Sequence, residues 1–182
     1  MTSPQSPERI EPDDKDWTWV LARQCPDCGF DASAMGRTEI GTLVEAVVAT
    51  FTAALAGPGA RERPVPAVWS PLEYGCHVRD VCELFDERLR LMLTSDDPLF
   101  ANWDQDETAL ARRYWQQQPA VVAREFAAAA SGIAASFASV AGDQWDRPGR
   151  RSGGSVFTVD TFARYFVHDL VHHAHDVTGS AR

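Results

Sequence analysis

FVHDLVHHAHDV, residues 166–177, is the most informative stretch of this sequence, because it combines helical periodicity with a cluster of potential metal ligands. Its apolar residues continue a spacing of three or four positions that begins at Phe162, and this spacing predicts an amphipathic helix over residues 159–178. Gly179 suits the position just after the end of this helix. Most of the histidines of the chain therefore fall on one helix, near the C-terminus.

This helix offers two pairs of potential ligands, each four residues apart. His168 and His172 form one pair, and Asp169 and His173 form the other. Residues at this spacing lie about one turn apart on the same helix face, and imidazole and carboxylate groups both bind zinc-like ions. A helical wheel places Asp169 and His173 nearer to the apolar face and the other pair on the opposite side. The wheel favours Asp169 and His173 as ligands, with His168 and His172 as the alternative.

Three further helices are predicted, at residues 38–56, 71–93 and 119–140. The first repeats apolar residues at helical spacing, and the last is rich in alanine, the best helix former. The middle one begins with Ser70-Pro71-Leu72-Glu73, which fits an N-cap, a proline at the first helical position and a capping box. We find no strand pattern. Four amphipathic helices in 182 residues predict an all-α protein with one domain, a four-helix bundle.

The remaining histidine, His77, lies on the apolar stripe of the predicted helix 71–93. Facing helices of a bundle can build a metal site from side chains that point inward. We therefore predict that His77, Asp169 and His173 bind one divalent metal ion. The alternative is that His77 is a core histidine with satisfied hydrogen bonds and that the histidines near the C-terminus face the solvent.

Two short motifs resemble those of the DinB-like superfamily, which includes the mycothiol-dependent maleylpyruvate isomerases and related thiol transferases. They are Trp69-Ser70-Pro71 followed by His77, and HDLVHHAHD at residues 168–176. The resemblance spans about residues 38–178. It implies a four-helix bundle with a long crossover connection and a divalent metal, zinc or nickel, held by a histidine of the second helix and two ligands four residues apart on the last.

The resemblance also bears on which pair binds the metal. In the isomerase-like branch the pair is a carboxylate and a histidine, with an aspartate three residues further on, and Asp169, His173 and Asp176 match this pattern. Asp176 would then orient the ring of a ligand. Other members carry two histidines followed by an Arg-Gly-Gln-like stretch. His168 and His172 match those histidines, but no such stretch follows them.

The activity that the resemblance implies is that of a transferase or isomerase. The metal would lower the pKa of a low-molecular-weight thiol such as mycothiol, and the thiolate would attack an electrophile. The alternative function is a non-catalytic module that binds metal or a partner protein. An enzyme and such a module are both compatible with the sequence.

Possible substrate-binding residues precede the ligands on the last helix. Arg147, Arg150 and Arg151 stand in a glycine-rich loop, and Tyr165 lies one turn before Asp169. Arginines at the mouth of a metal site could bind the carboxylate or another anionic part of a substrate in a bidentate manner. Tyr165 could donate a hydrogen bond to a ligand of the metal. The alternative is a solvated loop and a packed tyrosine.

The N-terminal part divides into two regions ahead of the bundle, which we assign to residues 38–182. Residues 1–16 are polar, acidic and rich in proline, and we expect them to be disordered. Residues 17–37 form an irregular arm. We expect its aromatic residues, such as Trp17 and Phe30, to anchor it on the bundle.

The arm contains Cys25-Pro-Asp-Cys28-Gly29, which looks like half of a zinc knuckle, and the sequence has no second CxxC motif. The two cysteines could be a redox pair or half of a metal site that a partner chain completes. They could instead belong to a tight turn, with Gly29 supplying unusual backbone angles, that packs the arm. The sequence favours the turn.

Charge and composition limit the class of partner. The net charge of −9 opposes sequence-independent binding to nucleic acid and docking on anionic membranes. The first residues lack the basic start and apolar run of a secretory signal, and we expect no stretch to reach the uncharged length of a membrane span. We therefore expect a cytoplasmic protein with reduced cysteines and a small-molecule substrate, and we leave a homodimer open.

Overall fold

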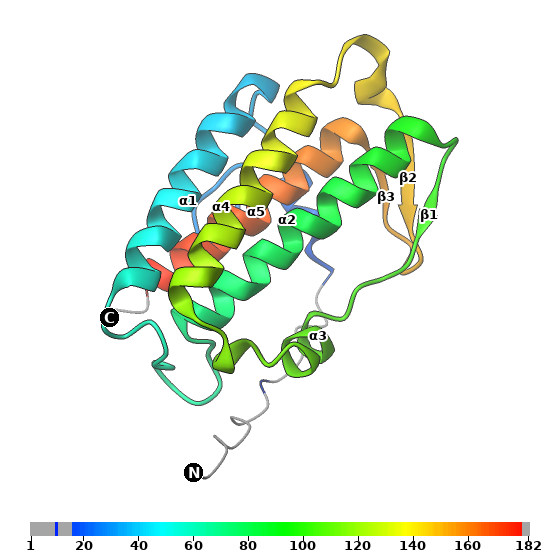
Figure 1. The fold of residues 1–182 in the computed structure, drawn as a ribbon. Coiled ribbons are helices and arrows are strands. Elements are labelled where there is room, and N and C mark those ends of the chain that lie inside the picture. Colours follow the sequence, from blue (N-terminus) through cyan, green and yellow to red (C-terminus); the bar gives the residue numbers. More distant parts are fainter. Residues whose placement is uncertain (1–9, 11–15, 180–182) are drawn as a thin grey trace.

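The computed structural model describes Ile10 and residues 16–179, and it shows the predicted four-helix bundle (Figure 1). The four long helices are α1 (Ile40–Ala56), α2 (Pro71–Thr94), α4 (Pro119–Ala138) and α5 (Val159–Gly179). These bounds lie close to the predicted ones. The lead-in at residues 1–16 lies almost entirely outside the described residues.

The order of the helices in space requires one long connection. Helices α1 and α2 each pack against both α4 and α5. Because α2 and α4 run in the same direction (Figure 1), the chain must return along the bundle between them. This crossover contains strand β1 (Leu99–Phe100) and helix α3 (Gln105–Ala111). Short 3₁₀ helices complete the helical part: η1 (Trp17–Leu21), η2 (Arg37–Glu39), η3 (Tyr114–Gln116) and η4 (Gly142–Asp146).

The absence of strands was a wrong prediction. A small sheet in the order β1-β2-β3 lies at one end of the bundle, where β2 (Pro148–Arg151) pairs parallel to β1 and antiparallel to β3 (Val156–Thr158). The strands are too short to show alternation in sequence, and β2 begins with proline, which is disfavoured inside sheets. The sheet joins the crossover to the segment that leads into α5.

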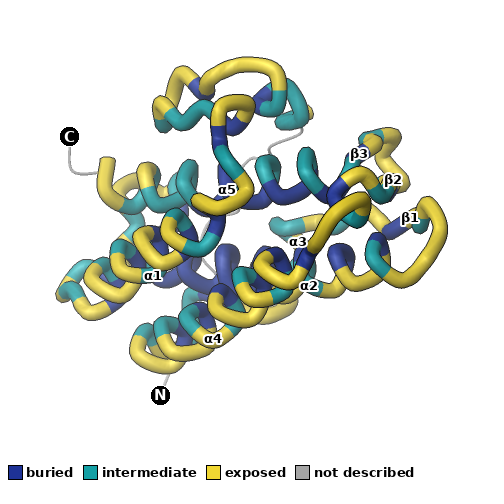
Figure 2. The backbone as a smooth tube through the Cα atoms, turned by 90° about the horizontal axis from the view of Figure 1, so that it is seen from above, coloured by how far each residue is buried: buried dark blue, intermediate teal, exposed yellow. Residues whose placement is uncertain are grey.

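Two helices have the length and apolar composition of membrane spans, contrary to our expectation. They are the segments Arg37–Ala56 and Pro119–Ala138, with mean hydropathies of 1.5 and 1.3. Core helices of soluble proteins pass the same test, and each of these helices buries one stripe at helical spacing while its other residues face outward (Figure 2). The stripe of α4 consists of Val122, Phe126, Ala130, Ile133 and Phe137.

The start of α2 confirms the predicted capping box. Ser70 Oγ accepts a hydrogen bond from Glu73 N, and Glu73 Oε2 accepts one from Ser70 N at 2.9 Å. Arg63 donates two hydrogen bonds from its Nε and Nη2 atoms to the same carboxylate. Burial raises the pKa of Glu73, but Arg63 and Ser70 have the larger combined effect and lower it. This cap fixes the turn of α2 that precedes His77.

The N-terminal arm packs against α5. Its helix η1 begins at the N-cap Asp16 and contacts α5. Arg164 of α5 donates hydrogen bonds to the carbonyl oxygens of Ala32 and Ser33, at 2.9 and 2.6 Å. Val20, Cys25 and Ala32 are fully buried. The arm therefore covers the face of α5 that lies away from the other long helices.

Candidate metal centre

The three predicted ligands meet between α2 and α5. The His77 Nε2 atom lies 3.7 Å from Asp169 Oδ1, and the His173 Nε2 atom lies 3.8 Å from the same oxygen. The rings of His77 and His173 have centroids 4.7 Å apart. Two ligands of a tetrahedral zinc ion lie about 3.4 Å apart when the bonds measure about 2.1 Å. These side chains are therefore spaced to surround one ion.

Buried donor atoms of two of these side chains, His77 and Asp169, have no hydrogen-bond partner among the described residues. Both ring nitrogens of His77 and the Oδ1 atom of Asp169 are buried and lack a hydrogen bond. The distances of 3.7 and 3.8 Å are too long for hydrogen bonds. An unsatisfied buried polar atom is costly, and the meeting of two such side chains with a third potential ligand, His173, is best explained by a bound cation. The residues present thus fit a divalent metal ion.

The protonation states also suit a metal. Burial lowers the pKa of His77, so that its imidazole is neutral at pH 7. Burial alone would raise the pKa of Asp169, but His77 and His173 beside it have the larger combined effect and lower it to about 2. Neutral imidazoles and an ionised carboxylate are the forms that bind divalent ions.

Neighbouring rings and a carboxylate hold the ligands in place. The ring of Trp103 stacks on His77 with an interplanar angle of 16°, and Trp69 lies against the same imidazole at 5.3 Å between centroids. The Nδ1 atom of His173 is 2.9 Å from Asp176 Oδ2, which matches the orienting role predicted for Asp176. A partner on the second ring nitrogen fixes which nitrogen faces the metal. His173 therefore presents Nε2 towards Asp169.

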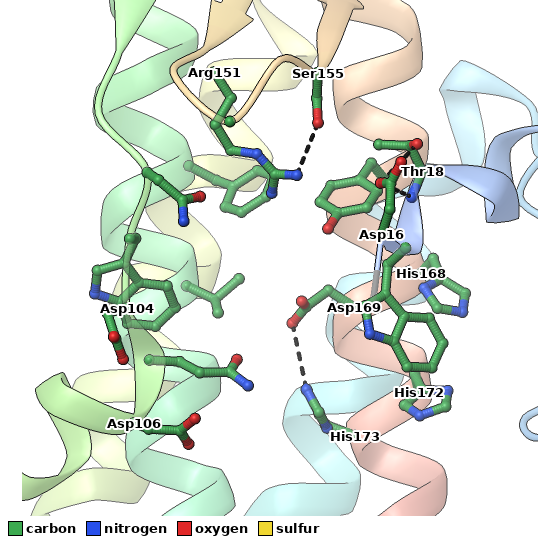
Figure 3. Close-up of a pocket in the computed structure, with 18 of the residues that line it drawn as sticks. Asp16, Thr18, Asp104, Asp106, Arg151, Ser155, His168, Asp169, His172 and His173 are labelled. Carbon is green, nitrogen blue, oxygen red and sulfur yellow. Dashed lines mark hydrogen bonds and ion pairs between the residues drawn. The ribbon is translucent and has the colours of Figure 1, made fainter. Parts of the chain in front are cut away.

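A cavity of about 930 Å³ is lined by Asp169 and His173, whereas the buried His77 is not among its lining residues. Asp169 and His173 point into it from α5, and Asp104 and Asp106 of the crossover lie on the facing wall (Figure 3). Asp16 and Thr18 of the arm border it as well. Three protein ligands at the edge of a cavity leave room for a further ligand, which is the arrangement of catalytic rather than structural zinc sites.

Two arginines of the cavity form no ion pair with an acidic residue within the described part of the chain. Arg88 is only 6% exposed, and burial together with the nearby Arg151 lowers its pKa to about 10, so it remains charged at pH 7. Its side chain donates a hydrogen bond to the Ala101 carbonyl at 2.7 Å. Arg151 binds Ser155 Oγ through Nη2, while its buried Nε has no partner. Two close positive charges that form no ion pair among the described residues are suited to an anion, although the Asp16 carboxylate interacts with Arg151 across the cavity.

The four residues predicted to bind substrate fall into two groups, according to whether they line the cavity. Tyr165 and Arg151 line the cavity, whereas Arg147 and Arg150 do not. Arg147 donates hydrogen bonds to the carbonyls of Met92 and Ser95, and Arg150 pairs with Asp97 at 2.9 Å. These contacts tie the sheet to the end of α2.

The sequence reasoning missed Arg88 and the role of Trp103. A charge on the buried stripe of α2, three residues after Phe85, was the signal that could have identified Arg88. No comparable signal exists for Trp103. Its position over His77 depends on the path of the crossover, which local sequence does not encode.

The alternative ligand pair lies on another side of α5. His168 and His172 also border the cavity, but they lie to the right of Asp169 and His173 in Figure 3, beside Asp16 and Thr18 of the arm. The wheel therefore orders the two pairs correctly with respect to α2. The His168 and His172 side chains meet the arm, where they come close to Cys25 and Cys28.

The comparisons with known proteins agree with this geometry. No curated protein matches the chain in sequence. YfiT from Bacillus subtilis, described as "a probable metal-dependent hydrolase with an unusual four-helix bundle topology", has a similar fold, with a TM-score of 0.73 over 80% of this chain and 86% of YfiT at 15% identity. The family model of the DinB superfamily matches residues 40–177, which span all four long helices and both parts of the candidate metal centre. The chain is a member of the DinB superfamily.

Proposed function

We propose that this protein is a metal-dependent transferase or isomerase that activates a low-molecular-weight thiol, of the mycothiol type, for attack on an electrophile. The observation that carries the proposal is the three-ligand centre of His77, Asp169 and His173 at the edge of the cavity. A divalent ion held there supplies a Lewis acid that lowers the pKa of a thiol or a water molecule. The expected metal is zinc, with nickel as the second choice.

Other residues of the cavity bind and orient the substrate. Arg88 and Arg151 bind an anionic group, such as a carboxylate of the electrophile or of the thiol, and hold it in the cavity. Burial raises the pKa of Tyr165, so its phenol stays protonated and can donate a hydrogen bond towards a substrate oxygen. The tryptophan rings around His77 limit the access of water to the ligands. A small anionic molecule is the substrate class that these contacts favour.

Two other functions compete with this proposal. The description of YfiT favours hydrolysis, in which water takes the place of the thiol at the same ligands. A non-catalytic module that binds metal or a partner protein is the second alternative. Thiol chemistry and hydrolysis both require an open position on the metal, whereas the module does not.

The test uses tag-free, metal-loaded protein with a panel of anionic electrophiles, in the presence and in the absence of a low-molecular-weight thiol. We expect thiol consumption that depends on the enzyme and disappears in His77→Ala. The variant Arg151→Gln tests the role of the arginines in binding the anion. Arg150→Gln is its matched control, because both arginines lie on β2 and only Arg151 borders the cavity. Turnover without thiol would assign hydrolysis instead. Full activity in His77→Ala would refute a catalytic role. A metal bound by four protein ligands at this centre would refute it as well.

A further inference from the structure

The CxxC motif of the arm lies against the two histidines of α5 that the first centre does not use. Each of the four side chains offers one donor atom, and these four atoms all lie within 4.8 Å of one another. We propose that the chain binds a second zinc ion, with a structural role, through four side chains: Cys25, Cys28, His168 and His172. This site is independent of the proposed catalytic function.

The distances agree with tetrahedral zinc. The Sγ atom of Cys25 lies 3.7 Å from the Nδ1 atom of His172. For Zn–S bonds of about 2.3 Å and Zn–N bonds of about 2.05 Å, a sulfur and a nitrogen ligand lie about 3.6 Å apart. Two thiolates with two neutral imidazoles also balance the charge of the ion.

The backbone around the cysteines has the form of a metal-binding turn. The amide of Cys25 donates to the Phe30 carbonyl, and the amide of Gly29 donates to the Cys25 carbonyl, both at 2.9 Å. Gly29 has a φ of +72°, a conformation that other residues rarely adopt. The turn thereby folds back on itself and carries both thiols towards α5. Two cysteines three positions apart and two histidines four positions apart have the spacing of many structural zinc sites.

Burial provides an independent observation. His168 is only 3% exposed, and its buried Nε2 atom has no hydrogen-bond partner among the described residues. A histidine that is buried only to fill space would bind a carbonyl or a hydroxyl group. Trp17 covers both imidazoles, with its ring centroid 5.9 Å from that of His168 and 5.0 Å from that of His172. Four protein ligands under such a cover leave no open position, which is typical of structural zinc.

This second site also explains how the arm is held. Apart from the contacts of Arg164 and the ion pair between Arg37 and Asp160, the described residues of the arm make few hydrogen bonds to the bundle. A zinc ion would join the arm to α5 beside the ligands of the first centre. The two sites are neighbours, because Asp176 Oδ2 lies 2.9 Å from Nδ1 of His173 in the first site and 3.9 Å from Nε2 of His172 in the second. The ion would thereby stabilise the wall of the cavity that Asp16 and Thr18 form.

The first experiment counts metal ions. Tag-free protein prepared with zinc, dialysed and measured by elemental analysis should hold about two zinc ions per chain, and the double variant Cys25→Ser, Cys28→Ser about one. His77→Ala should also retain about one, held by the other site. His175→Gln is the matched control on the same helix and should retain both. About one ion in the wild type that His77→Ala removes would overturn the proposal.

Cobalt identifies the ligands of each ion. Cobalt-substituted wild type and His77→Ala should both show the charge-transfer absorption of thiolate bound to cobalt. The double cysteine variant should lack this absorption, and so should His168→Gln, whose cysteines remain. Far-UV circular dichroism of each variant shows that the bundle is folded. A Cys25–Cys28 disulfide in the protein isolated without reductant, or wild-type cobalt protein without thiolate absorption, would refute the zinc site.

Discussion

The carboxylate of Asp176 lies 2.9 Å from the Nδ1 atom of His173, on the side of the imidazole opposite to the candidate metal. A carboxylate in this position fixes the tautomer of the ring and makes its other nitrogen a better ligand. The metal centre therefore extends one helical turn beyond its three ligands. Burial raises the pKa of Asp176, but His173 and the other nearby imidazoles have the larger combined effect and lower it.

We expect Asp176→Asn to weaken metal binding at the centre by about 10–100-fold without abolishing it, because the ring of His173 loses its charged partner. Competition with a chromophoric chelator measures this affinity. Asp143→Asn, in η4, is the control and should leave the affinity unchanged. An unaltered affinity in Asp176→Asn would show that the carboxylate does not support the ligand.

Substitution of the ligands tests which pair serves which centre. Asp169→Ala and His173→Ala should each remove the ion that His77 holds, because a three-ligand site loses most of its affinity with one ligand. His168→Ala and His172→Ala should leave that ion in place. Chelator competition on each variant separates the two results. If His168→Ala and His172→Ala strip the ion held by His77, the assignment of the pairs is wrong.

The arginines of the cavity predict a preference for anions. Arg151→Gln should weaken binding of a carboxylate-containing substrate or inhibitor by about 10–100-fold, the usual value of a hydrogen bond to a charged group. Arg150→Gln should change it little, because its guanidinium pairs with the exposed Asp97 outside the cavity. Calorimetric titration measures both affinities. Equal losses in the two variants would indicate a general effect of net charge.

The cap of α2 predicts a dependence of stability on pH. The pKa of Glu73 is lowered in the folded protein, so its contribution to stability is fully present above the unfolded pKa of about 4.3 and is lost as the pH falls through the folded pKa. Glu73→Gln should reduce the free energy of unfolding by about 1–3 kcal/mol at pH 7, because Arg63 loses its partner. The difference should shrink towards pH 3. Urea unfolding at both pH values measures it, with the exposed Glu45→Gln as the control.

The sequence predicted most of the fold, and it predicted that His77, Asp169 and His173 come together, because both depend on local periodicity. The capping box at Ser70 sets the phase of α2 and with it the direction of His77. The wheel of α5 then places Asp169 and His173 towards α2. Such information is contained in a few neighbouring residues and needs no knowledge of distant contacts.

The parts that the sequence did not predict depend on contacts between distant segments. The wheel assigned His168 to the side away from the bundle, and it could not show that the arm covers that side. The neighbours Arg150 and Arg151 alternate across a short strand, so only a structure shows which one reaches the cavity. The turn predicted for Cys25 and Cys28 is present, with Gly29 at a φ of +72°, but the two histidines beside it come from the other end of the chain and could not be placed there from local sequence.

The crossover between α2 and α4 lines the cavity but holds none of the three candidate ligands of the first centre. It adds few residues to the bundle core, yet it supplies Trp103, Asp104 and Asp106 to one wall of the cavity, while every ligand of the first metal comes from α2 or α5. Because the Trp103 ring also stacks on His77, changes at Asp104 and Asp106 are the ones that alter the cavity while the ligands and the long helices stay as they are. In laboratory evolution, libraries confined to residues 104–106 would vary this wall without touching the ring that packs on His77.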